Sequence, residues 1–221
     1  MRFVLAIGLL AIAQPLVAQE PPPRIGPFVV DLHATVPNFP QDPQLAASRD
    51  MQLGEMPGVG LGIQVGATVY VLRWKAITFG LGGEFASSHS GQTPLAGSGL
   101  RSATETFQTI SPQLSFNFGT GYGWSYLSGG IGGSTWSIIP AGQTPFPADS
   151  VRMKTINYGG GARWFAKKHL AFSFDVRIYQ IDPGAPYDVP PGTLPDYPAG
   201  TGLPGSPRTK LLILGAGISI K

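Results

Sequence analysis

The sequence predicts an all-β protein, an eight-stranded antiparallel up-and-down transmembrane β-barrel with short turns at one end and long loops at the other. Three observations predict this fold. Only 12% of the 221 residues are charged, against roughly 25% in an ordinary soluble domain. Apolar and small or polar residues alternate along eight segments, and no internal apolar run is long enough for a spanning helix. The links between the segments alternate in length, as they do in such barrels.

The composition also excludes several classes of function. The 15 basic and 12 acidic residues give a net charge of +3, with no block of like charge to follow a phosphate backbone, so nucleic acid is not an expected partner. The absence of cysteine excludes disulfides and thiolate metal sites. The glycines belong to the alternating segments and not to a strand-loop-helix phosphate cradle, so we expect no cofactor.

The first 18 residues have the pattern of a secretory signal peptide. Arg2 precedes an apolar stretch from Phe3 to Ala13, which is shorter than the ~20 residues that a spanning helix needs. We expect cleavage after Ala18, and a retained membrane anchor is the alternative. The predicted organisation is a signal peptide over 1–18, an extended proline-rich segment over 19–26 and a barrel over 27–221.

Each alternating segment has at least the ~9–11 residues with which a tilted strand crosses a bilayer. In the seventh segment, Phe172 and Phe174 alternate with Ser173 and Asp175. Pro112 removes a donor from the fourth segment, so we expect a bulge or a shorter strand there. The predicted strands cover residues 27–38, 58–73, 77–87, 106–118, 124–135, 154–165, 169–181 and 210–220.

The less apolar face of the strands predicts which way the barrel faces. A soluble barrel would expose lysine and glutamate, but this face carries mainly glycine, serine, threonine and glutamine. Apart from charged residues at the first or last position of a segment, all five charged residues within the strands share it. A lipid-facing arginine near the bilayer midplane would cost about 2–4 kcal/mol. We therefore expect aliphatic and aromatic residues to face lipid. The lumen should hold a polar network of Asp31, His33, Glu84, Arg163, Asp175 and Arg177.

Two contacts within this network are predicted from the depth of the residues along their strands. Glu84 and Arg177 lie at similar depth on facing walls and should pair or share a network. Arg163 lies nearer the end with the short turns and should meet Asp31 or Asp175, directly or through water. Such pairing is needed because an unpaired buried charge is costly.

The links predict the orientation in the membrane. Those at 40–57, 88–105, 136–153 and 182–209 are long, and those at 73–76, 119–123 and 166–168 are short. Bacterial outer-membrane barrels place their short turns in the periplasm, so we expect the cell outer membrane as the location. The expected partners are outer-membrane lipid, lipopolysaccharide and the assembly machinery. Aromatic residues beside the turns predict an interfacial belt of Trp74, Phe118, Trp124, Trp164 and Phe165.

One stretch resembles a known family. Gly159–Phe165, a basic turn through Lys167 and Lys168, and Leu170–Tyr179 resemble the strand-turn-strand signature of small bacterial outer-membrane β-barrels, the OmpA-like and OmpX-like eight-stranded family. Such barrels usually end in an aromatic residue that the assembly machinery recognises, whereas this sequence ends Ser219-Ile220-Lys221. No peptidoglycan-binding domain is expected after the barrel.

The function expected from these features is structural or adhesive. Eight strands enclose a space that side chains fill, so we expect a structural envelope barrel or surface binding through the loops, including the proline-rich link at 182–210. The alternatives are a narrow gated ion channel and a lipid-A-modifying enzyme. His89 between Ser88 and Ser90 is the candidate for such an enzyme, but no acid is placed to orient the histidine. We therefore expect no catalysis.

Overall fold

The computed structural model describes residues 23–143, 149, 152–182 and 207–221. Eight antiparallel strands, each paired with its neighbours in sequence order, close into a barrel because β1 pairs with β8. The strands are β1 Phe28–Asn38, β2 Leu61–Trp74, β3 Ile77–Gln92, β4 Ala103–Thr120, β5 Gly123–Pro140, β6 Met153–Phe165, β7 Leu170–Ile181 and β8 Thr209–Ile220. The predicted fold class is confirmed. The predicted signal peptide at 1–18 lies outside the described residues.

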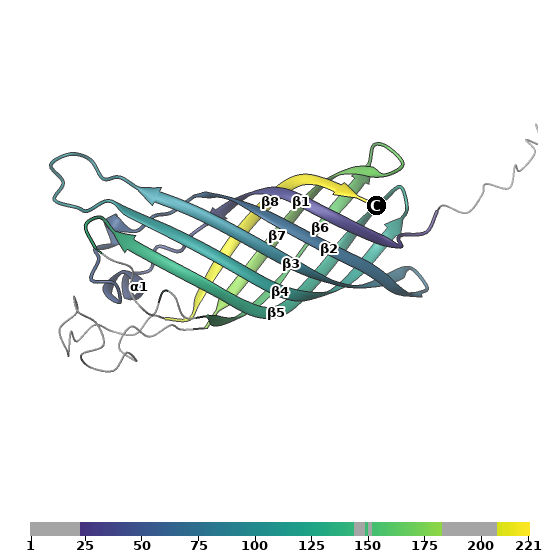
Figure 1. Ribbon diagram of the computed structural model, residues 1–221, viewed down its shortest axis with the longest axis horizontal. Coiled ribbons are helices and arrows are strands. Elements are labelled where there is room, and N and C mark those ends of the chain that lie inside the picture. Colours follow the sequence, from purple (N-terminus) through teal and green to yellow (C-terminus); the bar gives the residue numbers. More distant parts are fainter. Residues whose placement is uncertain (1–22, 144–148, 150–151, 183–206) are drawn as a thin grey trace, which may run out of the picture.

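The barrel has two different ends (Figure 1). The three short turns, the start of β1 and the end of β8 lie together at one end, which we call the turn end. The opposite ends of the strands, which the longer links join, lie at the other end, the loop end, together with the short helix α1 (Pro43–Ala47) and the 3₁₀ turn η1 (Leu53–Glu55). No helix among the described residues is long and apolar enough to cross a membrane.

Alternate residues face opposite sides of the barrel wall, as predicted. Val65, Phe174 and Leu214 are 39%, 42% and 48% exposed on the outer surface. Asp175 and Arg177 are 1% and 3% exposed and lie in the lumen, where they contact each other. Closure of the sheet gives the strands hydrogen-bonding partners on both sides, which is what a chain surrounded by hydrocarbon requires. These three apolar residues are therefore on the outside of the barrel and the two ionic residues on the inside.

Three strands are longer than the sequence predicted. β3 continues to Gln92, β4 begins at Ala103 and β5 continues to Pro140, so the predicted long links at 88–105 and 136–153 are shorter than expected. The added pairs include His89↔Thr106 and Phe107↔Trp136. The outer residues of this part, such as His89 and Thr106, are polar, so the apolar alternation that identified the strands ends before the pairing does.

The expectation of a bulge or a shorter strand at Pro112 is wrong. β4 runs through Pro112, which pairs with Gly83 of β3. On the other side, pairing with β5 is interrupted between Ile110↔Gly133 and Gln113↔Gly130 and resumes in the same register. The missing N–H of proline therefore leaves a local gap in the pairing of β4 with β5 but does not change the register of the strands. The irregularity in register lies instead between Tyr70 and Leu72 of β2.

Candidate functional site in the barrel lumen

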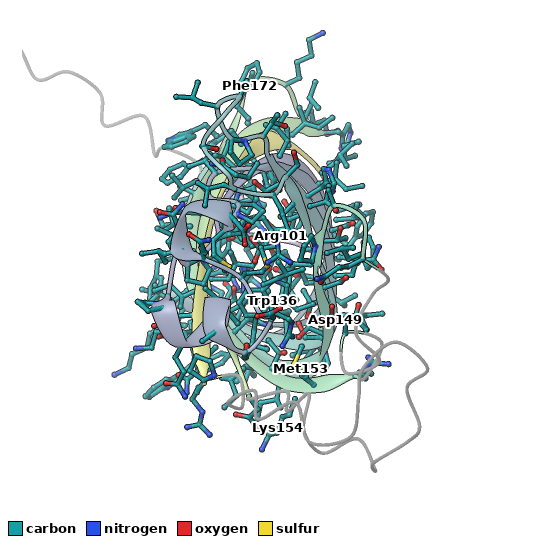
Figure 2. All side chains as sticks on the ribbon, turned by 90° about the vertical axis from the view of Figure 1, so that its left-hand side faces the viewer. Arg101, Trp136, Asp149, Met153, Lys154 and Phe172 are labelled. Atoms are coloured by element: carbon teal, nitrogen blue, oxygen red, sulfur yellow. The ribbon has the colours of Figure 1, made fainter. Side chains whose placement is uncertain are left out.

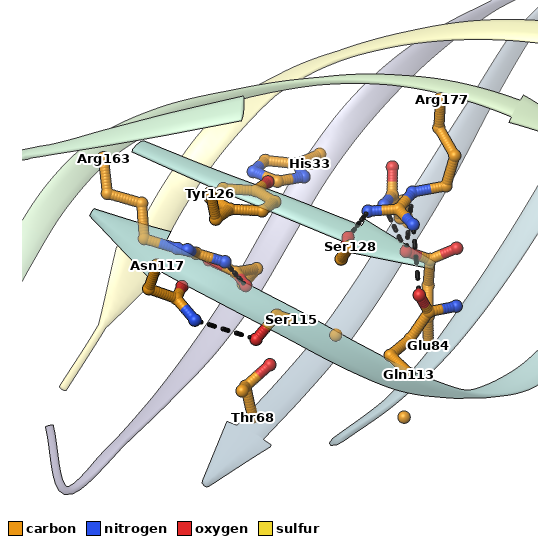
Figure 3. Close-up of a pocket in the computed structure, with 14 residues that line it drawn as sticks. His33, Thr68, Glu84, Gln113, Ser115, Asn117, Tyr126, Ser128, Arg163 and Arg177 are labelled. Atoms are coloured by element: carbon orange, nitrogen blue, oxygen red, sulfur yellow. Dashed lines mark hydrogen bonds and ion pairs between the residues drawn. The ribbon is translucent and has the colours of Figure 1, made fainter. Parts of the chain in front are cut away.

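Arg177 of β7 is the centre of a polar network in the lumen (Figure 3). Its Nε lies 3.0 Å from Glu84 Oε2, and its Nη2 lies 3.0 Å from Asp175 Oδ2. The same guanidinium donates to three neutral oxygens, those of Gln113 at 3.2 Å, Asn157 at 3.0 Å and Ser128 at 2.8 Å. The structure thus brings together Glu84 and Arg177 from different walls of the barrel.

The two carboxylates of this network have further donors. Glu84 accepts hydrogen bonds from Tyr179 Oη at 2.6 Å and from Gln64 Nε2 at 2.9 Å. Asp175 accepts from Tyr126 Oη at 2.7 Å. These side chains come from six strands, β2 to β7. The network therefore connects most of the barrel wall through its interior, and each charge has a partner of opposite sign.

A second ion pair lies closer to the turn end. Arg163 of β6 donates to Asp31 of β1 through Nε at 2.8 Å and Nη2 at 2.6 Å. Ser219 of β8 donates to the same carboxylate at 2.5 Å. His33, the remaining polar residue predicted for the lumen, does not join either ion pair directly, and its Nε2 lies 2.8 Å from Ser173 Oγ.

Tyr126 connects the two ion-pair clusters. The Arg163 guanidinium lies 3.9 Å from the centre of the Tyr126 ring, while the hydroxyl of that ring bonds to Asp175. The space left between these groups is a cavity of about 30 Å³, lined by both arginines and by the carboxylates Asp31 and Glu84. This volume holds one or two water molecules, so the centre of the lumen is filled by side chains.

The structure separates the predicted aromatic belt into two groups. Trp74, Phe118 and Trp164 lie on the outer surface at the turn end, with 61%, 40% and 56% of their surface exposed. Trp124 is only 3% exposed, and Phe165 stacks on it with ring centres 4.9 Å apart. The prediction was wrong for Trp124 and Phe165. Trp124 alternates in step with Tyr126 on β5, and Phe165 alternates in step with Arg163 on β6. Both therefore face the inside of the barrel.

The loop end holds a feature that the sequence did not predict. Residues 39–60, which we call the cap segment, fold against the barrel mouth, and the view onto this end shows the helical part of the segment at one side of the mouth (Figure 2). Asp42 begins α1 by accepting hydrogen bonds from the backbone N–H groups of Gln44 and Leu45. The buried apolar side chains at this end form one cluster, which includes Phe39, Leu45, Met51, Met56, Phe107, Trp136, Ile138 and Ile213.

Ion pairs fix the cap segment to the rest of the loop end. Arg101 lies 2.9 Å from Glu55, and Arg49 lies 2.8 Å from Asp149. Arg101 also donates to the backbone oxygen of Asp50. Its hydrogen bonds lower the pKa of the buried Glu55 carboxyl to about 2, although burial alone would raise it. The apolar residues of this otherwise polar link, such as Leu45 and Met56, were the only sequence feature that could have indicated that the segment folds against the barrel.

The candidate histidine and serines do not assemble into an acyl-transfer site. His89 lies on the outer surface of β3, with Nδ1 3.4 Å from Thr106 Oγ1. Ser88 and Ser90 are buried and belong to the inward phase of the same strand. Adjacent residues of a strand point to opposite faces, so a histidine and its sequence neighbours cannot meet here. The proline-rich link at 183–206 lies outside the described residues.

Comparison with known proteins supports the fold. No protein-family model matches the chain, and no curated protein is detectably similar to it. The crystal structure of Neisserial surface protein A (NspA) superposes with a TM-score of 0.53 and 12% identity, covering 89% of this chain and 97% of that one. Ail of Yersinia pestis, also solved with the heparin analogue sucrose octasulfate, gives a TM-score of 0.49 at 12% identity, covering 87% and 97%. The chain has the fold of the small eight-stranded outer-membrane β-barrels, as its sequence predicted.

Proposed function

We propose that this protein is an integral barrel of the cell outer membrane, closed to diffusion, with a structural role in the envelope and a loop end available for surface contact. The observation that supports this function best is the filled lumen, where two buried arginines are paired with three carboxylates around a cavity of about 30 Å³. Eight strands leave room for side chains but not for an open channel.

The lumen is closed at three levels along the barrel axis. The apolar cluster of the cap segment fills the loop end, the Arg177 network fills the middle, and Trp124 with Phe165 fills the turn end. A gate would have to open all three levels. Separating a buried ion pair leaves uncompensated charges and costs roughly 3–5 kcal/mol, so the paired state is strongly favoured.

The proposed orientation is the one usual for barrels with short turns at one end and long loops at the other. In the proposed arrangement the turn end faces the periplasm and the loop end faces the outside. The chain would cross the inner membrane under the direction of residues 1–18, and the barrel would then be inserted by the assembly machinery into a membrane that carries lipopolysaccharide. Because the cap segment is held by Glu55–Arg101 and Arg49–Asp149, the loop end would present a preformed surface to a ligand. The separated positions of His89, Ser88 and Ser90 argue against an enzyme.

Planar-bilayer recording tests the closed lumen. The wild type and Arg177→Ala should both be silent, because the cap segment and Trp124 still close the barrel when Arg177 is removed. Arg208→Ala is the matched control, since its ion pair with Asp182 is exposed and lies outside the lumen. Unboiled gel migration first establishes that each variant is folded. Discrete conductance steps in the wild type that change in Arg177→Ala would contradict the proposal and support a gated channel.

A further inference from the structure

The charges at the two ends of the barrel are distributed differently. At the loop end, basic and acidic side chains pair with one another, as in Glu55–Arg101, Arg49–Asp149 and Arg208–Asp182. At the turn end, the described residues carry basic side chains and no aspartate or glutamate. These basic residues are Arg24, Arg73, Lys75, Lys167, Lys168 and Lys221. One end of the barrel therefore has a positive charge that no described acidic side chain balances.

Most of these cations surround a single pocket. Arg24, Lys167, Lys168 and Lys221 line a cavity of about 860 Å³ together with His169. Its apolar walls are Pro27, Phe28, Tyr122 and Phe165. The volume lies within the roughly 300–1,000 Å³ of typical ligand sites and greatly exceeds what a lone phosphate ion would fill. The pocket thus combines cationic groups with apolar surface.

Four segments of the chain meet to form this pocket. Gly121 of the β4–β5 turn donates its N–H to Pro23 O at 2.6 Å. Lys221 donates its N–H to His169 O at 3.2 Å, beside the β6–β7 turn. The Lys221 ammonium donates to the carbonyl of Gly121 and lies 3.7 Å from the centre of the Phe165 ring. These contacts hold the four segments around the pocket together.

The pocket reaches the surface that faces the membrane. Phe28 belongs to the outward phase of β1 and is 46% exposed. The outer aromatic residues Trp74, Phe118 and Trp164 lie at this same end, where aromatic side chains mark the boundary between hydrocarbon and water. A ligand in the pocket would therefore lie at the depth of lipid headgroups.

We propose that this pocket binds the headgroup of an anionic phospholipid from the periplasmic leaflet of the outer membrane. The lysines and Arg24 meet the phosphate, and Phe28 and Pro27 contact the start of the acyl chains. Basic groups at a membrane surface attract anionic lipids with about 1 kcal/mol per residue, which is about five-fold in affinity for each charge. This inference rests on the proposed function, because it requires the turn end to lie in the periplasmic leaflet.

Native mass spectrometry of the delipidated barrel tests the proposal. Phosphatidylglycerol and phosphatidylcholine are offered separately, and retained lipid is counted. The wild type should retain phosphatidylglycerol at least ten-fold better than phosphatidylcholine. The double variant Lys167→Gln/Lys168→Gln should bind phosphatidylglycerol about twenty-five-fold more weakly, from about five-fold per charge. Arg73→Gln/Lys75→Gln is the matched control, since it removes two charges from the same end outside the pocket and should change binding less than two-fold.

Three results would overturn the proposal: equal retention of the two lipids, equal losses in the two double variants, or displacement of phosphatidylglycerol by millimolar inorganic phosphate or soluble peptidoglycan fragments. The last result would assign the pocket to a free anion or an acidic glycan. Unboiled gel migration in vesicles of both lipids separates these failures from failure of the proposed function. A barrel that inserts but shows no lipid preference contradicts the pocket alone, whereas a chain that does not insert contradicts both.

Discussion

Arg163 and Asp31 form a two-point ion pair across the lumen, with N–O distances of 2.8 and 2.6 Å. The two residues lie on β6 and β1, which are not adjacent in the sheet. Both side chains are buried. The fork of a guanidinium matches the two oxygens of a carboxylate, so the pair fixes the relative positions of two distant strands as well as neutralising their charges.

Removal of one partner of this pair should strongly destabilise the barrel. Asp31→Asn leaves the Arg163 guanidinium buried without its counter-charge, and we expect a loss of roughly 3–5 kcal/mol. Urea unfolding of the barrel in detergent micelles, followed by unboiled gel migration, measures this loss. Asp182→Asn is the control, because the exposed pair with Arg208 should contribute only about 0–1 kcal/mol. Similar losses in the two variants would show that the lumen pair has no special role.

A glycine beside Tyr126 should be required for packing in the lumen. A Cβ at Gly161 would lie 2.7 Å from Tyr126 Oη and would collide with the carbonyl of Phe174. Gly161→Ala should therefore displace the tyrosine that bonds to Asp175, at a cost of about 1–3 kcal/mol. Gly66→Ala is matched to it, since this glycine also faces the lumen and its added Cβ would meet nothing closer than 3.8 Å. The prediction fails if the two alanine variants unfold at the same urea concentration.

The attachment of the cap segment should depend on pH. The ordinary pKa of a glutamate is 4.5, and Arg101 lowers that of Glu55 to about 2. Since the folded pKa is the lower one, this contact contributes fully above about pH 4.5 and is lost as the pH falls towards 2. Oxidative footprinting of Met56, which is fully buried against the barrel, reports on attachment. Oxidation of Met56 should rise below pH 4.5 in the wild type.

Arg101→Gln should expose Met56 already at neutral pH, because the charge that holds Glu55 is gone. Trp124, which is buried at the turn end and lies outside the cap cluster, serves as the internal reference for general unfolding. If Met56 and Trp124 become oxidised together at every pH, the cap segment does not open independently of the barrel, and the ion pair between Glu55 and Arg101 is not what holds it.

The sequence predicted the parts of the structure that depend on strand phase. Phe174 and Asp175 are adjacent in sequence and point to opposite faces, so the alternation alone places one outside and the other in the lumen. The same phase would have placed Trp124 correctly, because it alternates in step with Tyr126. Its position beside a short turn was a weaker indication of an outward-facing side chain, because the aromatic residues beside such turns include both inward-facing and outward-facing ones.

The contacts across the lumen could be predicted only in part. Depth along the strands brings Arg163 near either Asp31 or Asp175. Which of the two carboxylates it contacts depends on the tilt and stagger of the strands, and the sequence of a single strand does not determine these. The cap segment was missed because it has neither a helical nor a strand period. Its fold depends on a surface that exists only after the strands have closed, the apolar mouth formed by Phe107, Ile138 and Ile213.

The orientation of the barrel wall can be measured directly without substitutions, from nuclear Overhauser effects between lipid acyl chains and protein methyl groups in nanodiscs. Neighbouring residues provide their own controls, since Val30 and Leu214 are 41% and 48% exposed while Val29 and Ile213 are 0% and 1% exposed. Val30, Val65 and Leu214 should show contacts to acyl chains, and Val29 and Ile213 should show none. Acyl-chain contacts to Val29 and Ile213 with none to Val30 and Leu214 would contradict the outward-facing apolar surface on which the proposed membrane location and function depend.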